Sequence, residues 1–242
     1  MIIESKDNKK IKYINKLRNN KFMNEEKKFI VEGHHLVNEA KNSGILLETF
    51  ATSNLDYGVI NNLVSDGIMS YISNLPSKTN VVGICKFIND NEILGNKIII
   101  LDNVQDPGNL GTIIRSAKAF NIDTIVLSLD SVKKYNEKVI RSTQGMLFKV
   151  NVITRDLNEF IPFLIKNNYN VYGTDVNGGI NIKNIDKNCK TAIVMGNEGQ
   201  GISPKIKEII DKNIYIDINC ECESLNVAVA SSIIMYELNR RD

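Results

Sequence analysis

The chain has 242 residues, of which 43% are hydrophobic and 24% charged, and its formal net charge is +2. This composition is globular and excludes long disordered, collagen-like and low-complexity segments. No apolar run approaches the roughly 20 residues of a membrane span, and no amino-terminal secretory signal is recognisable. Four cysteines in a chain of this length do not indicate a disulfide scaffold. We therefore expect a cytoplasmic protein with no membrane partner.

The amino-terminal segment concentrates positive charge. Residues 1–28 hold nine lysines and arginines against four acidic residues, a net charge of +5, so the rest of the chain carries −3. The spacing of Ile11, Ile14 and Leu17 predicts an amphipathic helix over residues 8–19, with lysines around its other faces. Clustered positive charge attracts a phosphate backbone, although a solvated helix face is the alternative reading.

The first part of the chain predicts a small α/β domain. A polar stretch at residues 89–96 separates this part from the remainder of the chain and is typical of a linker. The expected elements are strands at 29–32, 46–51 and 81–87 and a helix at 33–41.

The second part predicts a larger α/β domain with a parallel sheet. Short apolar runs typical of buried strands alternate with helical patterns, as in βαβ units. Several of these runs end in unusual polar loops, which is where open α/β sheets bind ligands. The expected strands are 98–101, 124–127, 171–175, 192–195 and 214–218.

The first unusual loop comes after the strand at 98–101. Pro107 and Gly108 predict a turn, and Asn109 is a good candidate for the N-cap of the next helix. On that helix Gly111 and Arg115 share the polar side, so the glycine would leave room for a ligand at the guanidinium. An ordinary capped helix with an exposed arginine is the alternative.

The second loop, residues 196–201, has three glycines in six positions. Such spacing implies backbone that turns tightly or lies against a ligand. It is neither the dinucleotide fingerprint nor a P-loop, and Glu198 within it would repel phosphate. Ser203 and Pro204 then predict the start of a helix.

The third loop comes after the strand at 214–218. We expect Ser224 to open the final helix, which is apolar on nearly every side between Leu225 and Ala230. A helix of this kind is buried on every side, and packing against a second subunit would cover it.

In this order and spacing, the three loops resemble the signature motifs of the SpoU (TrmH-type) RNA 2′-O-ribose methyltransferases of the SPOUT class. The likeness covers residues 97–242 and implies an α/β parallel-sheet domain with a carboxy-terminal trefoil knot. Residues 29–40 are similar to the small L30e-like RNA substrate-binding domain of that family. We therefore expect two domains, residues 1–95 and 96–242.

The resemblance implies a cofactor, S-adenosylmethionine, and an RNA substrate, most of all 23S ribosomal RNA. It also implies a homodimer formed through the methyltransferase domain. One departure is visible, because the family commonly reads Ile-Pro-Met where this chain reads Ile216-Asp217-Ile218. The implied catalytic residues are Asn109, Arg115, Glu198, Ser224 and Asn226, and the implied cofactor-binding residues are Met195, Gly196, Gly201, Ile216, Ile218 and Leu225.

Arg115 would be the catalytic arginine near the target ribose and phosphate. Attack of a ribose hydroxyl on a sulfonium methyl group is in line, so positioning can supply much of the catalysis. A guanidinium with a pKa above about 12 is a poor general base. We therefore expect Arg115 to clamp a phosphate and to stabilise the developing alkoxide.

Three other functions stay open at this point. The chain could be a tRNA 2′-O-methyltransferase, a base-methylating relative, or a non-catalytic RNA-binding factor of ribosome assembly. No metal site is expected, because Cys220 and Cys222 lack a matching second pair. We expect Cys85 and Cys189 to be buried as small hydrophobic residues.

Overall fold

The computed structural model describes residues 2–176 and 178–240 and divides the chain into two compact units, Met1–Asn89 and Asp90–Asp242. The dividing point lies within the polar stretch 89–96, six residues before the expected domain boundary. Among the described residues, no helix is long and apolar enough to cross a membrane.

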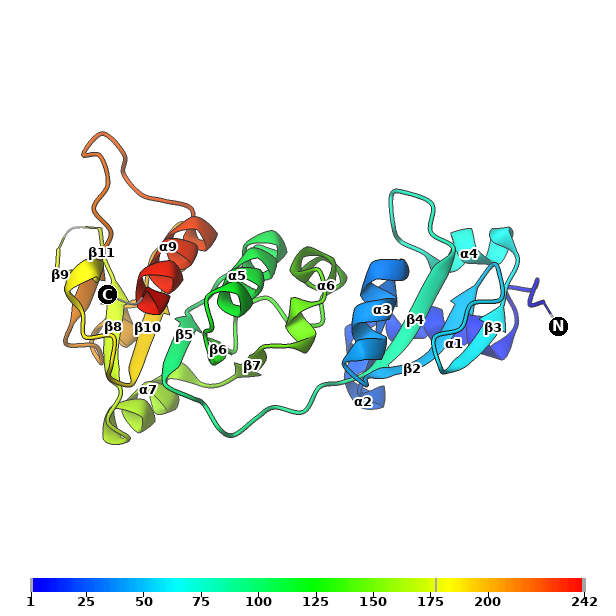
Figure 1. Ribbon diagram of the computed structural model, residues 1–242, viewed down its shortest axis with the longest axis horizontal. Helices are drawn as coiled ribbons and strands as arrows, with labels where there is room; N and C mark the ends of the chain where they lie inside the picture. The colour runs from blue at the N-terminus through cyan, green and yellow to red at the C-terminus, as the bar shows by residue number, and fades with distance from the viewer. Residues whose placement is uncertain (1, 177, 241–242) are drawn as a thin grey trace. The chain divides into compact units, whose positions relative to one another are not determined.

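The amino-terminal unit is a four-stranded mixed sheet covered by helices. The strand order is β1-β4-β2-β3, in which β4 runs antiparallel to both β1 and β2, and β2 runs parallel to β3. Helices α1 and α4 share one core with the sheet, and α3 packs on β1 and β4 (Figure 1). The elements are α1 (Lys9–Leu17), α2 (Asn20–Glu26), β1 (Lys28–Glu32), α3 (His34–Asn42), β2 (Leu46–Ala51), β3 (Ile60–Leu63), α4 (Asp66–Ile72) and β4 (Val81–Lys86).

The helix predicted near the amino terminus is confirmed as α1. Its apolar residues Ile11, Ile14 and Leu17 are buried in the core, and the side chain of Asn8 caps it by accepting the N–H of Lys10 at 2.9 Å. The predicted strands β1, β2 and β4 and the helix α3 are also confirmed. The prediction missed α2, β3 and α4, which are short and therefore carry little periodicity.

A buried ion pair ties the amino-terminal unit together. Arg18 comes directly after α1, and its Nη2 lies 3.0 Å from Oε1 of Glu32 at the end of β1. The hydroxyl of Ser73 donates to the same carboxylate at 2.6 Å, and the backbone N–H of Asn74 donates to it at 3.1 Å. The Arg18 guanidinium also donates to the carbonyl of Ile72. The carboxylate is thus neutralised and fully hydrogen-bonded, as a buried charge requires.

The second unit is a seven-stranded parallel sheet with the order β7-β6-β5-β10-β8-β11-β9. Helices α5, α6 and α9 lie on one face, and α7 lies on the other (Figure 1). The elements are β5 (Lys97–Leu101), α5 (Pro107–Ala119), β6 (Thr124–Leu127), α6 (Glu137–Thr143), η1 (Met146–Phe148), β7 (Asn151–Thr154), α7 (Leu157–Lys166), β8 (Asn170–Thr174), β9 (Ile180–Asn181), η2 (Ile182–Asn184), β10 (Thr191–Met195), α8 (Pro204–Lys207), β11 (Asn213–Tyr215) and α9 (Val227–Asn239).

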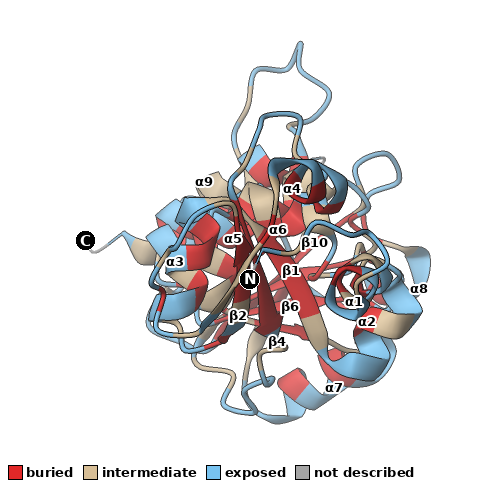
Figure 2. Cartoon of the chain, turned by 90° about the vertical axis from the view of Figure 1, so that its right-hand side faces the viewer, coloured by how far each residue is buried: buried red, intermediate tan, exposed pale blue. Residues whose placement is uncertain are grey.

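The central strands β5, β6 and β10 are buried and the outer helix faces are exposed, as the red strands and pale-blue helix surfaces in Figure 2 show. One core joins alternate residues of β5 and β6 to the apolar sides of α7 and α8. The expected α/β class with a parallel sheet is confirmed, and four of the five predicted strands are found at their expected places. The fifth, β11, ends at Tyr215 instead of residue 218, and the trefoil knot stays a prediction.

Candidate active site

The three unusual loops meet at the edge of the parallel sheet where its strands end, here called the carboxyl edge. They come after β5, β10 and β11, and a cavity of about 350 Å³ opens between the last two loops and the end of β8. The lining residues are Thr174, Asp175, Val176, Met195, Gly196, Asn197, Glu198, Gly199, Gly201, Ile202, Lys207, Ile214, Tyr215, Ile216, Ile218, Ser224, Leu225, Val227, Ala230 and Ile234.

Glu198 is the centre of a hydrogen-bond network beside this cavity. The side chain of Asn109 donates to its Oε1 at 3.0 Å, and the backbone N–H of Asp106 donates to the same oxygen at 3.2 Å. The backbone N–H of Gln105 and the side chain of Asn197 reach Oε2 at 3.4 Å each. The second loop is thereby connected to the first.

These donors shift the ionisation of the Glu198 carboxyl. Burial by itself would raise its pKa, but the hydrogen bonds from Asn109 and from backbone N–H groups outweigh burial and lower the pKa below its usual range. All of these donors are neutral. The carboxylate therefore stays ionised and keeps its negative charge at the cavity wall.

Asn109 and Asn226 join the first loop to the third. The Asn226 side chain donates to Oδ1 of Asn109 at 3.1 Å, so one chain of hydrogen bonds runs from Asn226 through Asn109 to Glu198. Asn226 also caps α9, because its Oδ1 accepts the backbone N–H groups of Ala228 and Val229. Three of the predicted catalytic residues are thus brought together.

Two predicted helix starts are wrong by a few residues. Asp106, and not Asn109, is the N-cap of α5, because its carboxylate accepts the N–H of Asn109 at 2.9 Å and Pro107 occupies the first helical position. This hydrogen bond lowers the pKa of Asp106. Ser224 does not open the final helix, since Asn226 is its N-cap. The side chain of Asn109 is thereby free of the capping role and reaches Glu198.

The glycines of the second loop serve the loop's own turn. A Cβ on Gly196 would lie 2.1 Å from the carbonyl carbon of Gly201, so the two backbone segments approach as only glycine permits. Gly201 has φ of +68°, the left-handed region. Asn197 and Gly201 exchange backbone hydrogen bonds at 2.9 and 3.0 Å, which close the turn. On this side the cavity wall is therefore backbone that is held in place by the hydrogen bonds of its own turn.

All six residues predicted to bind the cofactor line the cavity, as do Glu198 and Ser224. Three predicted catalytic residues do not line it: Asn109, Asn226 and Arg115. Asn109 and Asn226 are connected to it by the chain of hydrogen bonds that ends at Glu198. Their functional roles stay predictions. Sequence reasoning missed Asp175 and Lys207, which also line the cavity. Asp175 is the last residue of the predicted strand 171–175 and comes directly after the observed β8, and an acidic residue at the end of a strand could have indicated it.

Asp102 is a further residue that the prediction missed. It comes directly after β5, is only 6% exposed, and accepts the backbone N–H of Ser203 at 2.7 Å. Its own N–H donates to the carbonyl of Met195 at 2.9 Å. Asp102 therefore connects the end of the second loop to the first loop by a hydrogen bond. Its position directly after a buried strand could have indicated this role.

Arg115 stands apart from the network. It is exposed on α5, and within residues 2–176 and 178–240 its guanidinium forms no hydrogen bond or ion pair. The predicted space beside it is absent, because Gly111 is buried against α6 and a Cβ there would lie 2.2 Å from Cβ of Ser142. Gly111 thus permits close packing of α5 on α6, and Arg115 faces solvent.

The final helix, α9, is not buried on every side within one chain. Val229 is 48% exposed and Tyr236 is 53% exposed, and they lie on one face with the half-buried Ile233. This face borders the contact of α9 with α5, where the hydroxyls of Ser116 and Ser232 are 2.7 Å apart and the ring of Tyr236 meets that of Phe120 edge-on, with centroids 5.8 Å apart.

The cysteines differ in environment. Cys85 is buried as expected, and burial raises the pKa of its thiol. The prediction for Cys189 is wrong, because its thiol is exposed and donates to Asp186 at 2.9 Å. Cys220 and Cys222 are exposed on the third loop, and the described residues contain no group of three metal-ligating side chains.

A parallel sheet with a cavity at its carboxyl edge defines an α/β protein that binds a small molecule there. Residues 96–236 match the model of the SpoU rRNA methylase family, and residues 8–74 match that of the MRM3-like substrate binding domain. The chain therefore belongs to the SpoU rRNA methylase family and carries an amino-terminal substrate-binding domain. The family resemblance stated from the three loops is confirmed.

Relatives match along nearly the whole chain. The 23S rRNA (guanosine(2553)-2′-O)-methyltransferase RlmP of Bacillus subtilis is 35% identical over 98% of both chains. The AdoMet-bound rRNA methyltransferase of Sinorhizobium meliloti is 25% identical, with a TM-score of 0.87 over 98% of this chain and 97% of that one. The SpoU methyltransferase AviRb of Streptomyces viridochromogenes, in complex with AdoMet, is 20% identical with a TM-score of 0.84 over 94% and 96%, which shows the shared fold.

Proposed function

We propose that this protein transfers the methyl group of S-adenosylmethionine to a ribose 2′-hydroxyl of 23S ribosomal RNA, at the guanosine that corresponds to the target of the Bacillus subtilis relative. The observation that carries the proposal is the cavity at the carboxyl edge, lined by all six residues that the family motifs assign to the cofactor. Identity over nearly the full length of both chains supports the same target. Action on ribosomal RNA would place the protein in the cytoplasm.

The cavity fits S-adenosylmethionine in size and in charge. Its volume of about 350 Å³ lies within the range of small-molecule sites, about 300–1,000 Å³. Apolar side chains such as Ile216, Leu225 and Ile234 offer a surface for a flat base. Glu198 and Asp175 place carboxylates at the wall of a site whose ligand carries a sulfonium and an ammonium group. Bound there, the cofactor supplies an electrophilic methyl group.

The residues of this chain act mainly by positioning. Met195, Gly196 and Gly201 line one side of the cavity, and the hydrogen bonds from Asn226 through Asn109 to Glu198 connect the three loops. A preorganised site of this kind lowers the barrier of an in-line transfer because the reactants lose little further freedom. Ser224 lines the same cavity and would contact the substrate end of the ligand.

Arg115 is proposed to bind the phosphate beside the target ribose and to stabilise the alkoxide that develops there. Its guanidinium is exposed on α5 and has no hydrogen bond or ion pair to any residue that the structure describes, which supports this role because the group is available to an RNA ligand. Arginine binds phosphate through two parallel hydrogen bonds and stays charged at all working pH values.

We also propose that the protein is a homodimer through its methyltransferase domain. The exposed face of α9, with Val229, Ile233 and Tyr236, supports this, since apolar side chains in a row on a carboxy-terminal helix would be covered by a second copy. Sedimentation equilibrium should give twice the 27.2 kDa chain mass, and a clean monomer would overturn the dimer.

Methyl transfer from labelled S-adenosylmethionine to ribosomal RNA of cells lacking the gene tests the function. We expect label in one 2′-O-methylguanosine of 23S RNA. Label in tRNA would favour a tRNA enzyme, and label on a base would overturn the ribose mechanism. Cofactor binding without transfer to any RNA or ribosomal particle would favour an assembly factor.

The Arg115→Ala variant tests the catalytic assignment in the same assay. We expect turnover to fall by about a hundredfold or more while the dissociation constant of the cofactor changes less than about twofold, because Arg115 lies outside the cavity. Lys118→Ala, an exposed cation one turn further along α5, is the matched control and should retain activity. Loss of cofactor binding in Arg115→Ala would show that its role is wrongly assigned.

A further inference from the structure

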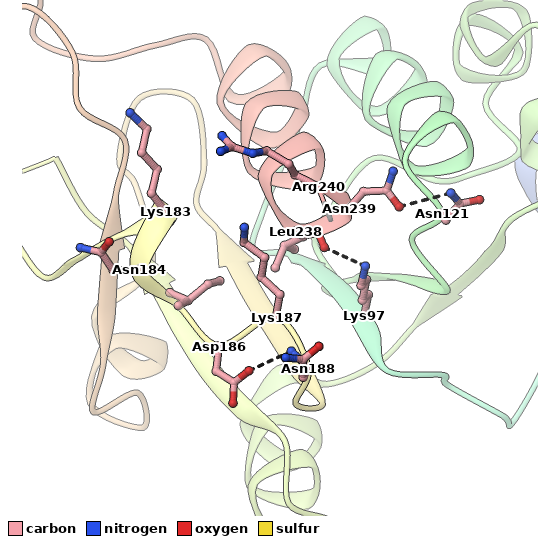
Figure 3. Close-up of a pocket in the computed structure, with 11 residues that line it drawn as sticks. Lys97, Asn121, Lys183, Asn184, Asp186, Lys187, Asn188, Leu238, Asn239 and Arg240 are labelled. Atoms are coloured by element: carbon pink, nitrogen blue, oxygen red, sulfur yellow. Dashed lines mark hydrogen bonds between the residues drawn. The ribbon is translucent and has the colours of Figure 1, made fainter. Parts of the chain in front are cut away.

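A second cavity lies at the opposite edge of the parallel sheet, where the strands begin. It has a volume of about 830 Å³, and the site already described uses none of its residues. Lys97 starts β5 at this edge, and α9 ends there. Figure 3 shows the cavity between the end of α9 and the segment around η2. The lining residues are Lys97, Asn121, Lys183, Asn184, Ile185, Asp186, Lys187, Asn188, Leu238, Asn239 and Arg240.

The lining is polar and predominantly cationic. Among its described lining residues, four side chains are cationic and one, Asp186, is acidic. The Asp186 carboxylate already accepts the N–H of Asn188 and the thiol of Cys189, each at 2.9 Å. Few apolar side chains line the cavity, so its surface does not match an apolar ligand. The cationic side chains match an anion instead.

The four cationic side chains differ in the groups that they contact. Lys97 donates to the carbonyl of Leu238 at 2.7 Å and so serves the negative end of the α9 dipole. Arg240 lies 3.7 Å from the Glu237 carboxylate, which offsets part of its charge. In Figure 3 the Arg240 guanidinium points toward the segment that carries Lys183 and Lys187. These three side chains surround the open space, and the two lysines come from one short stretch of chain.

We propose that this cavity binds a phosphate of the RNA substrate, through Lys183 and Lys187 with Arg240. The inference rests on the proposed function, because RNA is then the polyanion that the protein must hold. Phosphate contacts position an RNA without reading its sequence, and they can lie far from the reactive nucleotide. A strand of five residues spans about 17 Å, so the two cavities mark two separate points of contact on one domain.

The test is a titration of a transcript of the 23S RNA segment around the proposed target guanosine, repeated over a range of salt concentrations. Each phosphate contact contributes about 0.7–0.9 to the slope of log affinity against log salt. We expect the full-length double variant Lys183→Gln/Lys187→Gln to lower that slope by about 0.7–0.9, the contribution of one phosphate contact, and to weaken binding on the order of tenfold at about 0.1 M salt. Lys183→Arg/Lys187→Arg should restore both.

A matched control is Lys166→Gln/Lys205→Gln, which removes two exposed lysines of the same unit outside both cavities. It should change the affinity less than about twofold. An unchanged slope and affinity in Lys183→Gln/Lys187→Gln would overturn the proposal, and so would an equal loss in the control. Binding of inorganic phosphate alone, with RNA affinity unaltered by the variant, would assign the cavity to a small anion instead.

Cofactor affinity and turnover at saturating RNA separate this proposal from the proposed function. Both should be unchanged in Lys183→Gln/Lys187→Gln, while the KM for RNA rises. A wild-type protein that binds the transcript with the expected salt slope but methylates nothing would defeat the proposed function and leave the phosphate site standing.

Discussion

Two glutamates, one in each unit, show how the same carboxylate is used differently. Glu32 meets an arginine, a hydroxyl and a backbone N–H, and its side chain is only 7% exposed. Within the described part of the chain Glu198 meets only neutral donors, from Asn109, Asn197 and the backbone, and it faces a cavity. The charge of Glu32 is neutralised by a cation of the protein itself. The charge of Glu198 is stabilised by hydrogen bonds but not neutralised, so it can attract a cationic ligand. The first arrangement stabilises a fold and the second prepares a site.

Removing Glu32 should have the largest effect. Glu32→Ala removes the carboxylate that pairs with the part-buried Arg18 and accepts the hydroxyl of Ser73, and we expect the free energy of unfolding of the amino-terminal unit to fall by about 3–5 kcal/mol. Hydrogen exchange of β1 and α1 in the full chain measures this loss. Glu25→Ala, at an exposed position on α2, is the control. Equal protection in both variants would mean that the ion pair contributes little.

Removing the charge of Glu198 should act on the ligand instead. We expect Glu198→Gln to weaken S-adenosylmethionine binding about tenfold, roughly 1.4 kcal/mol, because a carboxylate beside the cationic ligand is lost. Calorimetric titration should show a smaller loss for S-adenosylhomocysteine, which has no sulfonium. Glu223→Gln removes an exposed charge from the third loop and is the control. Equal losses for both ligands would contradict the electrostatic role.

The hydrogen bonds that connect the loops can be weakened without changing charge. Asn226→Ala removes the cap of α9 and the bond to Asn109, and we expect a loss of about 1 kcal/mol in the free energy of unfolding. Thermal unfolding measures it, with Asn219→Ala in the third loop as the comparison. If Asn226→Ala also loses turnover while it still binds the cofactor, the connection positions the substrate side of the site.

The pH dependence of stability gives the smallest effect. The folded-state pKa of Glu198 is lowered, so its stabilisation is complete above the unfolded value of about 4.3 and is lost as pH falls through the folded pKa. We therefore expect the stability difference between wild type and Glu198→Gln to be constant near neutral pH and to shrink in acid. Unfolding transitions between about pH 3 and 7 test this, and a difference that grows in acid would reverse the sign.

Local pattern was sufficient for much of the architecture. The stripe of Ile11, Ile14 and Leu17 predicted α1, and the apolar runs predicted the buried strands of the parallel sheet, because periodicity reports which faces are buried. The spacing of glycines around Glu198 indicated a turn at the end of a strand. Short elements with polar residues, such as β3, carried no such signal and were missed.

The sequence by itself determined the family, the parallel sheet and eight of the residues that line the cavity, since each depends on order and spacing along the chain. Only the tertiary structure decided that Asp106 and Asn226 cap the two helices, which leaves Asn109 to reach Glu198. It also decided that the space beside Gly111 is filled by Ser142. The physical reason is that these contacts join loops far apart in sequence, and competition among neighbouring donors and acceptors is settled only when the loops meet at the edge of the sheet.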